Sequence, residues 1–569
     1  MIGIKVQSDV ELKHSVKENG NIISYDLSWE KTAVKGNSAI TFLWEVPLLD
    51  IFYRWYPGVG GSRCIVPDWE SNVENSIASN APMVCFLNQK GENKYTVALS
   101  EFKKLTRMNF GVNEKTAGLS CRIELPLQQF LNSDTDKTTF AIKIDDEART
   151  FEEAVEDVGR WWETSIDVMD DPDFISDTFY SFWYSYHQDI TPEIVEKECE
   201  NLKGFGTNAV IVDDGWQTRD NNGGYAYCGD WKPLKFPNMK EHVERVHNMG
   251  LKYILWYSVP FIGLKAESYP QFMDKTLYNT RGAAVLDPRY KEVREYLIST
   301  YEKALMEWGL DGFKLDFIDE FKNVNNIPAN DMMDIKDLYD AVFTLMTDIK
   351  NRIKAIKEDI AIEFRQTDIG PAMRSYGNFF RVGDCPNDFI RNRVHSLDLR
   401  LLSLSTPIHS DMLMWNKNEC VENCALQIIN VIFSILQISV KLKEQSEEHK
   451  KMLKFWLNFT KDNKDILQKS KLKVYDLQNL YTLAEGIEKN KKISAVYTPD
   501  KCVKLDKAEV IAINGTQYDY IIAEFIDKYI CDIYNCMGEK VREFRNENNG
   551  IYKISVPSAG LVIARKIIG

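Results

Sequence analysis

The hydrophobic and polar positions of this chain follow different patterns in its successive parts. Residues 1 to about 165 form short apolar or alternating runs, such as Tyr95 to Leu99 and Thr139 to Ile144, separated by Gly, Asn, Asp and Pro. Such runs are typical of a β-sandwich. A polar stretch from Met169 to Asp173 then marks a boundary. We therefore predict an N-terminal β-sandwich over residues 1–168.

From residue 175 to 482, strand-like apolar runs alternate with helical segments. Seven runs recur, at 182–186, 209–213, 253–257, 313–317, 360–364, 379–382 and 407–409, and we expect an eighth at 437–440. This alternation predicts an α/β fold, a (β/α)8 TIM barrel over residues 175–482. Residues 485–569 return to β character, which predicts a small C-terminal antiparallel β-sandwich domain.

Charge and composition exclude several classes of partner. The net charge is −14 and we find no stripe of Lys and Arg that would neutralise phosphates, so we expect no nucleic-acid partner. The start of the chain has no basic segment followed by an apolar run, and no stretch of about 20 apolar residues follows. We therefore expect no membrane partner and a cytoplasmic location. The 11 Cys are odd in number and lie mostly in apolar runs, as expected of reduced thiols, and no second pair completes a zinc site with Cys420 and Cys424.

Two aspartates at the ends of predicted strands carry the candidate chemistry. Asp316 ends the run from Gly312, and Asp384 follows the run from Phe379. Hydrolysis of a glycosidic bond needs one carboxylate that attacks and one acid that protonates the leaving oxygen. Lys314 lies on the same strand face as Asp316 and would keep that carboxylate charged and nucleophilic. Asp384 is then the candidate acid, although its neighbour Arg381 favours its charged form.

Polar and aromatic residues recur at the other strand ends, where a TIM barrel has its active site. The candidates for substrate contacts are Asp213, Asp214 and Trp216 after the second strand, Trp256 in the third, Arg365 after the fifth and His409 at the seventh, which Asp411 follows. Trp183 in the first predicted strand would form an apolar wall for a sugar ring.

Several motifs, in their order and spacing, carry a family resemblance. They are Val212-Asp213-Asp214-Gly215-Trp216, Gly229-Asp230-Trp231, Gly312-Phe313-Lys314-Leu315-Asp316 and Arg381-Val382-Gly383-Asp384. Together they resemble the retaining α-galactosidases of glycoside hydrolase family 36.

The resemblance implies roles for individual residues. Asp316 matches the nucleophile, Asp384 the acid/base, and Asp213 with Asp214 the residues that bind galactose hydroxyls. Other wall and subsite positions are matched by Trp256, Lys314 and Arg381. The resemblance further implies a small oligosaccharide substrate, no metal or organic cofactor and a possible homo-oligomer.

Two departures from the family pattern leave alternatives open. The run after Asp384 is one residue longer than in the family, which makes Asp388 a rival for the acid. The stretch from Arg365 to Gly370 replaces a Gly- and Ser-rich sugar-binding segment, and Lys314-Leu315-Asp316-Phe317 with the Gly-Asp-Cys run also resembles family 31. The sugar is therefore galactose or another α-linked residue, such as N-acetylgalactosamine, glucose, xylose or a substituted galactose. A non-catalytic carbohydrate-binding protein on the same scaffold is the alternative from another class.

Overall fold

A computed structural model of the protein describes residues 3–130, 136–365 and 369–567. By its internal contacts the chain divides into two compact units. The first comprises Met1–Asp170, Gln217–Lys240 and Trp256–Phe380, and the second Asp171–Trp216, Glu241–Leu255 and Arg381–Gly569. The predicted domain limits stay a prediction.

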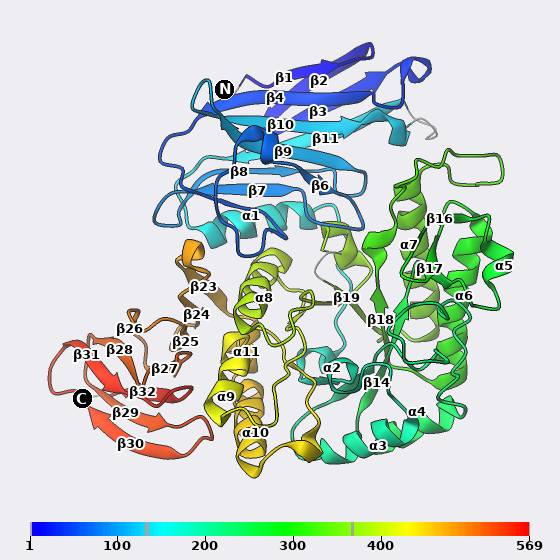
Figure 1. Ribbon diagram of the computed structural model, residues 1–569. Coiled ribbons are helices and arrows are strands. Elements are labelled where there is room, and N and C mark those ends of the chain that lie inside the picture. The colour runs from blue at the N-terminus through cyan, green and yellow to red at the C-terminus, as the bar shows by residue number, and fades with distance from the viewer. Residues whose placement is uncertain (1–2, 131–135, 366–368, 568–569) are drawn as a thin grey trace. The chain divides into compact units, whose positions relative to one another are not determined.

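The N-terminal part of the first unit is a sandwich of two antiparallel sheets (Figure 1). One sheet has the order β1 (Lys5–Ser8), β4 (Ala39–Pro47), β10 (Gly118–Pro126), β9 (Thr106–Asn113) and β6 (Val73–Asn75). The other has the order β2 (Leu12–Asn19), β3 (Ile22–Trp29), β11 (Lys137–Asp145), β8 (Asn93–Leu99), β7 (Met83–Leu87) and β5 (Tyr53–Trp55). Alternate residues of β4 are buried, and Phe42 stacks on Phe140 of the other sheet with ring centres 4.8 Å apart. The predicted alternation therefore builds one core between the sheets.

Helix α1 (Phe151–Glu163) follows the sandwich and packs along β7 and β8 (Figure 1). Thr150 begins it with a capping box, in which its side chain accepts a hydrogen bond from Glu153 N while the Glu153 side chain accepts one from Thr150 N. Trp162 Nε1 donates to Leu99 O at 2.8 Å, which connects the helix to β8.

An eight-stranded sheet forms the barrel. Its order is β21 (Ile408–His409), β20 (Phe379–Arg381), β19 (Ala361–Arg365), β18 (Gly312–Asp316), β14 (Lys252–Ser258), β13 (Ala209–Val212), β12 (Phe179–Ser181) and β22 (Gln437–Ile438). Neighbouring strands such as β18 and β19 run parallel. Parallel bridges from His409 to Ile435 and from Leu413 to Ile438 bring the two ends of the sheet together. The sheet is thus nearly closed, as the predicted TIM barrel requires.

The first barrel strand differs from its prediction. The strand is β12, whereas residues Trp183–Tyr186 form the short helix α2. Aromatic residues favour strands, but this preference depends on the surroundings. Here the chain has already left the sheet after Ser181, so Trp183 lies on a helix rather than on an inner strand.

Helices alternate with the barrel strands and continue to the end of the barrel region. They are α3 (Pro192–Asn201), α4 (Met239–Asn248), α5 (Tyr269–Phe272), α6 (Lys291–Trp308), α7 (Leu338–Ile356), α8 (Phe389–Ser403), α9 (Val421–Asn430), α10 (Glu447–Asp462) and α11 (Lys464–Gln468). None of the helices among the described residues combines the length and the apolar character that a membrane crossing needs.

A small extra sheet follows β14 in the first unit. Its order is β15 (Phe261–Gly263), β17 (Ala283–Leu286) and β16 (Thr276–Thr280), all antiparallel. The loop of residues 217–240 lies against this sheet, because Gly263 N donates to Cys228 O at 2.7 Å and Lys265 N to Ala226 O at 2.9 Å. A Cβ on Gly263 would lie 2.1 Å from Ala226 O, so this close approach needs glycine. The loop is therefore held on a regular support.

The C-terminal part of the second unit consists of two further sheets around their own core. One has the order β23 (Lys471–Tyr475), β24 (Leu483–Ile487), β25 (Lys491–Val496), β27 (Glu509–Asn514), β32 (Leu561–Lys566), β29 (Tyr529–Tyr534) and β30 (Lys540–Arg545). The other has the order β26 (Cys502–Leu505), β28 (Tyr520–Phe525) and β31 (Gly550–Ser555). Most pairs are antiparallel, as predicted, and the pairs β25–β27 and β26–β28 run parallel.

Candidate active site

The strands β18 and β19 place charged side chains on one face of the sheet. Lys314 and Asp316 share a face because they lie two residues apart on one strand. The register of the parallel pair sets Glu363 opposite Lys314, so the Glu363 side chain leaves the sheet on the same face. Lys314 is 3% exposed and Glu363 0%. Sequence reasoning did not select Glu363, although an acidic residue inside an apolar strand was a usable signal.

Asp316 is a buried carboxylate surrounded by donors. It ends β18 and is 6% exposed. Trp256 Nε1 donates to its Oδ2 at 3.0 Å, and Phe317 N donates to its Oδ1 at 2.9 Å. Arg365 Nε forms an ion pair with the same Oδ1. Hydrogen-bond donors and a cation at this distance favour the ionised carboxylate, the form that a nucleophile requires.

Arg365 joins Asp316 to a second carboxylate that sequence reasoning missed. Its Nη2 lies 2.8 Å from Asp319 Oδ1, and its Cζ lies 4.7 Å from the centre of the Phe317 ring. Burial raises the pKa of Asp319, while Arg365 lowers it and the charge of Asp316 raises it. Arg365 is thus fixed by two carboxylates, those of Asp316 and Asp319, and by the face of the Phe317 ring. The rest of the stretch that distinguishes this chain after strand five begins with residues 366–368, which lie outside the described residues.

Trp256 belongs to an aromatic cluster next to Asp316. Its ring centre lies 6.2 Å from Tyr225 in a stacked arrangement and 6.1 Å from Trp231. Tyr225 also contacts Phe261 and Phe317, each with ring centres 5.2 Å apart. Trp256 is only 1% exposed because these rings cover it, whereas Tyr225 is half-buried. Sequence reasoning missed Tyr225. This tyrosine lies in a Gly- and Asn-rich loop, and the sequence of the loop does not indicate that the Tyr225 ring covers Trp256.

Asp213 and Asp214 follow β13 in the second unit and are 4% and 3% exposed. Gln188 Nε2 donates to Asp214 Oδ2 at 2.7 Å, and Asp214 N donates to Asp213 Oδ1 at 2.9 Å. Gly215 has a φ of 130°, and a Cβ there would lie 2.8 Å from Gln188 Cα. Trp216 is 0% exposed, and its predicted contact with the substrate stays a prediction.

A network around Arg381 holds the candidate acid. Arg381 ends β20 and is buried, and its Nη2 lies 3.0 Å from Asp384 Oδ1. The Asp384 side chain is 54% exposed, unlike that of Asp316. Arg381 Nη1 also lies 2.7 Å from Asp411 Oδ1, and Tyr184 OH donates to Asp411 Oδ2 at 2.9 Å. One cation thus serves two carboxylates.

The rival acid Asp388 has a structural role. It is the N-cap residue of α8, where its Oδ1 accepts a hydrogen bond from Arg391 N at 3.0 Å. An aspartate at this position stabilises the helix N-terminus and interacts favourably with its positive end. This contact accounts for Asp388 without a catalytic role.

Two other candidates differ in exposure, since His409 is fully buried and Trp183 is half-buried. His409 is 0% exposed, its Nε2 lies 2.7 Å from Ile175 O and its Nδ1 lies 3.3 Å from Gln437 Nε2. Burial lowers the pKa of His409 to about 3, so the ring is neutral. Trp183 lies on α2 with its ring 4.7 Å from that of His187. His409 is therefore a core residue, and Trp183 does not belong to an inner strand.

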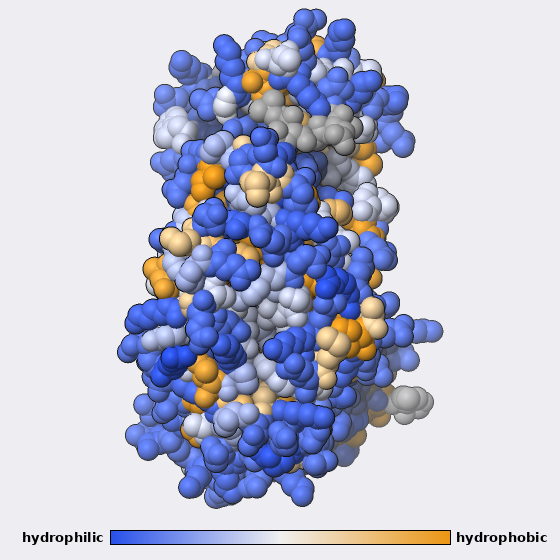
Figure 2. Space-filling view, turned by 90° about the vertical axis from the view of Figure 1, so that its right-hand side faces the viewer, coloured by the Kyte–Doolittle hydropathy of each residue, from blue (hydrophilic) through white to orange (hydrophobic). Residues whose placement is uncertain are grey.

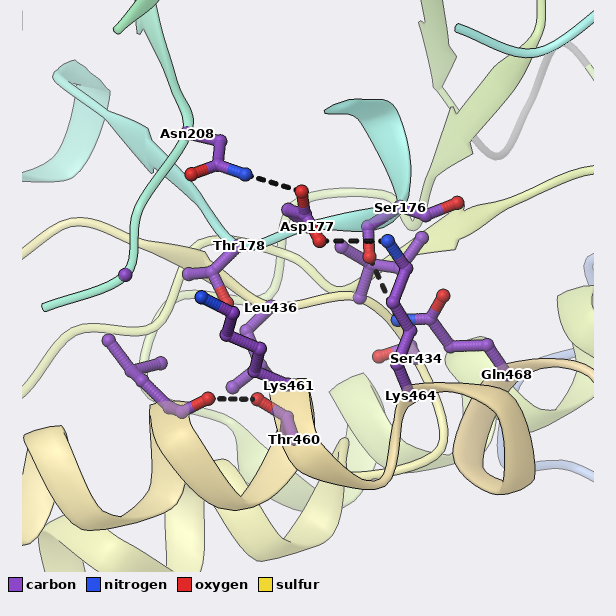
Figure 3. A pocket seen from close by; sticks show the side chains of 13 residues that line it. Ser176, Asp177, Thr178, Asn208, Ser434, Leu436, Thr460, Lys461, Lys464 and Gln468 are labelled. Atoms are coloured by element: carbon purple, nitrogen blue, oxygen red, sulfur yellow. Dashed lines mark hydrogen bonds and ion pairs between the residues drawn. The ribbon is translucent and has the colours of Figure 1, made fainter. Parts of the chain in front are cut away.

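A small polar pocket in the second unit lies at the N-terminal ends of the barrel strands, opposite to the ends where Asp316 and Asp384 lie (Figure 3). Asp177 at its centre binds Lys464 Nζ at 2.8 Å and also accepts a hydrogen bond from Asn208. Its lining precedes β12 and β22, whereas catalytic residues of TIM barrels follow the strands. This pocket is therefore not at the strand ends where the sequence predicts the active site. Among the described residues, no cluster of His, Cys, Asp and Glu is arranged to hold a metal ion.

The barrel region matches a known protein family. The model of the glycosyl hydrolases family 31 TIM-barrel domain matches residues 176–492, over half of the chain. The chain belongs to this family of glycoside hydrolases. Family 31 was the second likeness that the sequence motifs indicated.

Solved α-galactosidases share the fold of the whole chain. The family 36 α-galactosidase AgaA of Geobacillus stearothermophilus, in complex with raffinose, superposes with a TM-score of 0.66 at 14% identity, covering 100% of this chain and 82% of that one. The α-galactosidase of Lactobacillus brevis gives 0.65 at 11% identity, with 100% and 86% covered. The predicted fold class, a TIM barrel between β domains, is thereby confirmed.

Curated relatives match over shorter stretches. Alpha-galactosidase 2 of Pediococcus pentosaceus is 26% identical over 193 residues, 32% of this chain and 26% of the relative. The A type blood alpha-D-galactosamine galactosaminidase of Flavonifractor plautii is 24% identical over 176 residues, 26% of this chain and 16% of the relative. The matched stretch thus spans about a quarter or less of these relatives. The predicted likeness to family 36 α-galactosidases is confirmed.

Proposed function

We propose that this protein is a retaining exo-α-glycosidase that releases terminal α-linked galactose from small oligosaccharides. The observation that carries the proposal is the setting of Asp316, a buried carboxylate at a strand end that a cation, an indole N–H and a backbone N–H all hold. Likeness to α-galactosidases, one of them solved with raffinose, supports the choice of galactose.

The mechanism is a double displacement. Asp316 attacks the anomeric carbon while the bond to the leaving oxygen breaks, and Asp384 gives that oxygen its proton. Water then attacks the glycosyl–Asp316 ester, Asp384 takes the proton from water, and Asp316 leaves as a carboxylate. The different exposure of the two side chains, 8% for Asp316 and 54% for Asp384, supports this division, because Asp384 must exchange protons with water.

Asp213 and Asp214 would bind the hydroxyls of the sugar, and Gln188 would hold Asp214 in place. Trp256, Lys314, Arg381 and Arg365 would complete the site. A homo-oligomer and a cytoplasmic location stay predictions.

The decisive experiment is proton NMR of the first product from 4-nitrophenyl α-galactoside. Release of α-galactose before mutarotation supports retention, whereas β-galactose as first product would refute the double displacement. Asp316→Ala should lose essentially all hydrolysis, and azide should restore turnover of the aryl glycoside as a glycosyl azide. Full activity of that variant would also refute the proposal.

The acid is identified by a matched pair of variants. Asp384→Asn should lose turnover of raffinose far more than turnover of a dinitrophenyl glycoside, whose leaving group needs little protonation. Asp388→Asn should keep both activities, because asparagine is as good an N-cap as aspartate. The reverse result would make Asp388 the acid.

A second candidate keeps the mechanism and changes the sugar. The family 31 match and the galactosaminidase relative favour including α-glucoside, α-xyloside, α-galactosaminide and α-N-acetylgalactosaminide in the panel. Turnover of one of these without turnover of the galactoside would replace the substrate. Sugar binding without turnover of any donor would favour a carbohydrate-binding protein.

A further inference from the structure

Asp411 is a fully buried carboxylate beside the candidate acid. It follows β21 and is 0% exposed. Its Oδ1 lies 2.7 Å from Arg381 Nη1, while its Oδ2 accepts hydrogen bonds from Tyr184 OH at 2.9 Å and from Cys385 N at 2.7 Å. Each of these partners donates, whereas a protonated carboxyl would need an acceptor for its O–H. The contacts therefore identify Asp411 as ionised.

Arg381 divides its guanidinium between two carboxylates of unequal exposure. Nη1 faces the buried Asp411 and Nη2 faces Asp384 Oδ1 at 3.0 Å. Asn392 fixes Asp411 from behind, since its Oδ1 accepts a hydrogen bond from Asp411 N at 3.1 Å. The arrangement is rigid on the Asp411 side and open to water on the Asp384 side.

A general acid next to a lone arginine faces a conflict. It must carry its proton at the working pH, but a cation at 3.0 Å favours the ionised form. A second negative charge on the same guanidinium offsets that cation. We propose that Asp411 is a positioning residue for the candidate acid Asp384, because it shares the charge and fixes the direction of Arg381. This inference rests on the proposed function.

Tyr184 and Cys385, which both donate to Asp411, add no charge beside Asp384. Burial raises the pKa of Tyr184, and the charges of Asp411 and Asp384 raise it further, so the phenol stays neutral. Burial likewise raises the pKa of the Cys385 thiol, as does Asp411, whereas Arg381 and Arg391 lower it less. Burial raises the pKa of Asp411 itself, and Arg381 opposes that effect. Arg381 and Asp411 are thus charged groups beside Asp384, while Tyr184 and Cys385 are neutral.

The test is the isosteric variant Asp411→Asn. With Asp411 neutral, Arg381 favours ionised Asp384 more strongly, so the basic limb of the kcat/KM profile for raffinose should move down by about one pH unit. Dinitrophenyl glycoside should lose much less activity at the same pH, since its leaving group needs little help from an acid. An unmoved limb, with equal loss for both substrates at every pH, would overturn the proposal, because it would show a purely structural role.

A second variant covers the case in which Asp411→Asn does not fold. Arg381→Met with Asp411→Asn removes both charges, a change that proteins tolerate better than loss of one partner. Its basic limb should lie at or above that of the wild type, and a limb below it would overturn the proposal. Carboxyl ¹³C NMR of Asp-labelled protein, with Asp384→Asn to assign the signal, follows the same titration without turnover. A wild type that hydrolyses no donor would thus refute the proposed function, while the Asp384 titration would still decide the role of Asp411.

Discussion

Replacing Arg365 by methionine should change the pH at which the candidate nucleophile works. Arg365 binds Asp316 with its Nε and Asp319 Oδ1 with its Nη2 at 2.8 Å. Methionine keeps most of the side-chain length and the contact with Phe317, but it removes the cation. Asp316 and Asp319 then lose the cation that they share and titrate as a coupled pair.

The magnitude follows from the charges and their surroundings. The Arg365 cation and the Asp316 carboxylate are treated as two unit charges about 4 Å apart. At an effective dielectric constant of 20 they attract each other by about 4 kcal/mol, which corresponds to a shift of about three units in the pKa of Asp316. Asp316 keeps the hydrogen bonds from Trp256 Nε1 at 3.0 Å and Phe317 N at 2.9 Å, which continue to favour its ionised form. We therefore expect the acidic limb of the pH–rate profile to rise by about two pH units.

The assay measures kcat/KM for a dinitrophenyl α-galactoside from pH 3.5 to 8, because this substrate reports the nucleophile and not the acid. Asp319→Asn is the matched control, since it removes a negative charge from the other side of Arg365 and should lower the limb or leave it in place. Opposite shifts of the two variants support the electrostatic argument. An Arg365→Met profile that falls by one factor at every pH would refute it.

Three further changes act on stability. Lys104 Nζ lies 2.7 Å from the buried Asp337 Oδ1, so Lys104→Met should lower the free energy of unfolding by about 3 kcal/mol in urea at pH 8. This loss of stability should become smaller toward pH 4. Burial raises the pKa of Asp337, and a carboxyl group whose pKa is raised in the folded state stabilises the fold at low pH and loses that effect as the pH rises. His409 has its pKa lowered to about 3 by burial, so the wild type should lose about 1.4 kcal/mol per pH unit below pH 6.5, and thermal unfolding of His409→Gln should lack this slope. Gly215→Ala should cost about 1–3 kcal/mol in the same assay and weaken sugar binding in calorimetry, since its Cβ would lie 2.8 Å from Gln188 Cα; unchanged stability and affinity would contradict the strain.

Sequence periodicity could locate Asp316 because the chemistry and the strand coincide there. Lys314 and Asp316 lie in one short apolar run, and the period of two residues places both on one face. The same reasoning was wrong for Trp183, because an aromatic run shows strand preference even where the chain has turned into α2.

Contacts between distant segments were beyond that reasoning. The pair of Arg381 and Asp411 is joined across the whole of α8, and no local pattern indicates that one guanidinium serves two carboxylates. Arg365 could be selected as a strand-end cation, but its contact with Asp319 depends on the left-handed turn at Phe317, which has a φ of 67°. The sequence shows which charged residues lie at strand ends, but only the tertiary structure shows which of them form ion pairs with each other.

The loop that carries Tyr225 has a consequence for how this scaffold diversifies. Its backbone lies so close to β15 that no side chain fits at Gly263, and a Cβ on Gly229 would lie 2.9 Å from Ile262 Cγ1. Single substitutions where the loop meets β15 would separate the loop from its sheet before they changed how the aromatic rings of Tyr225 and Trp231 cover Trp256. New sugar preferences are therefore more accessible by exchange of the loop together with its three-stranded sheet, as one cassette, than by point mutation.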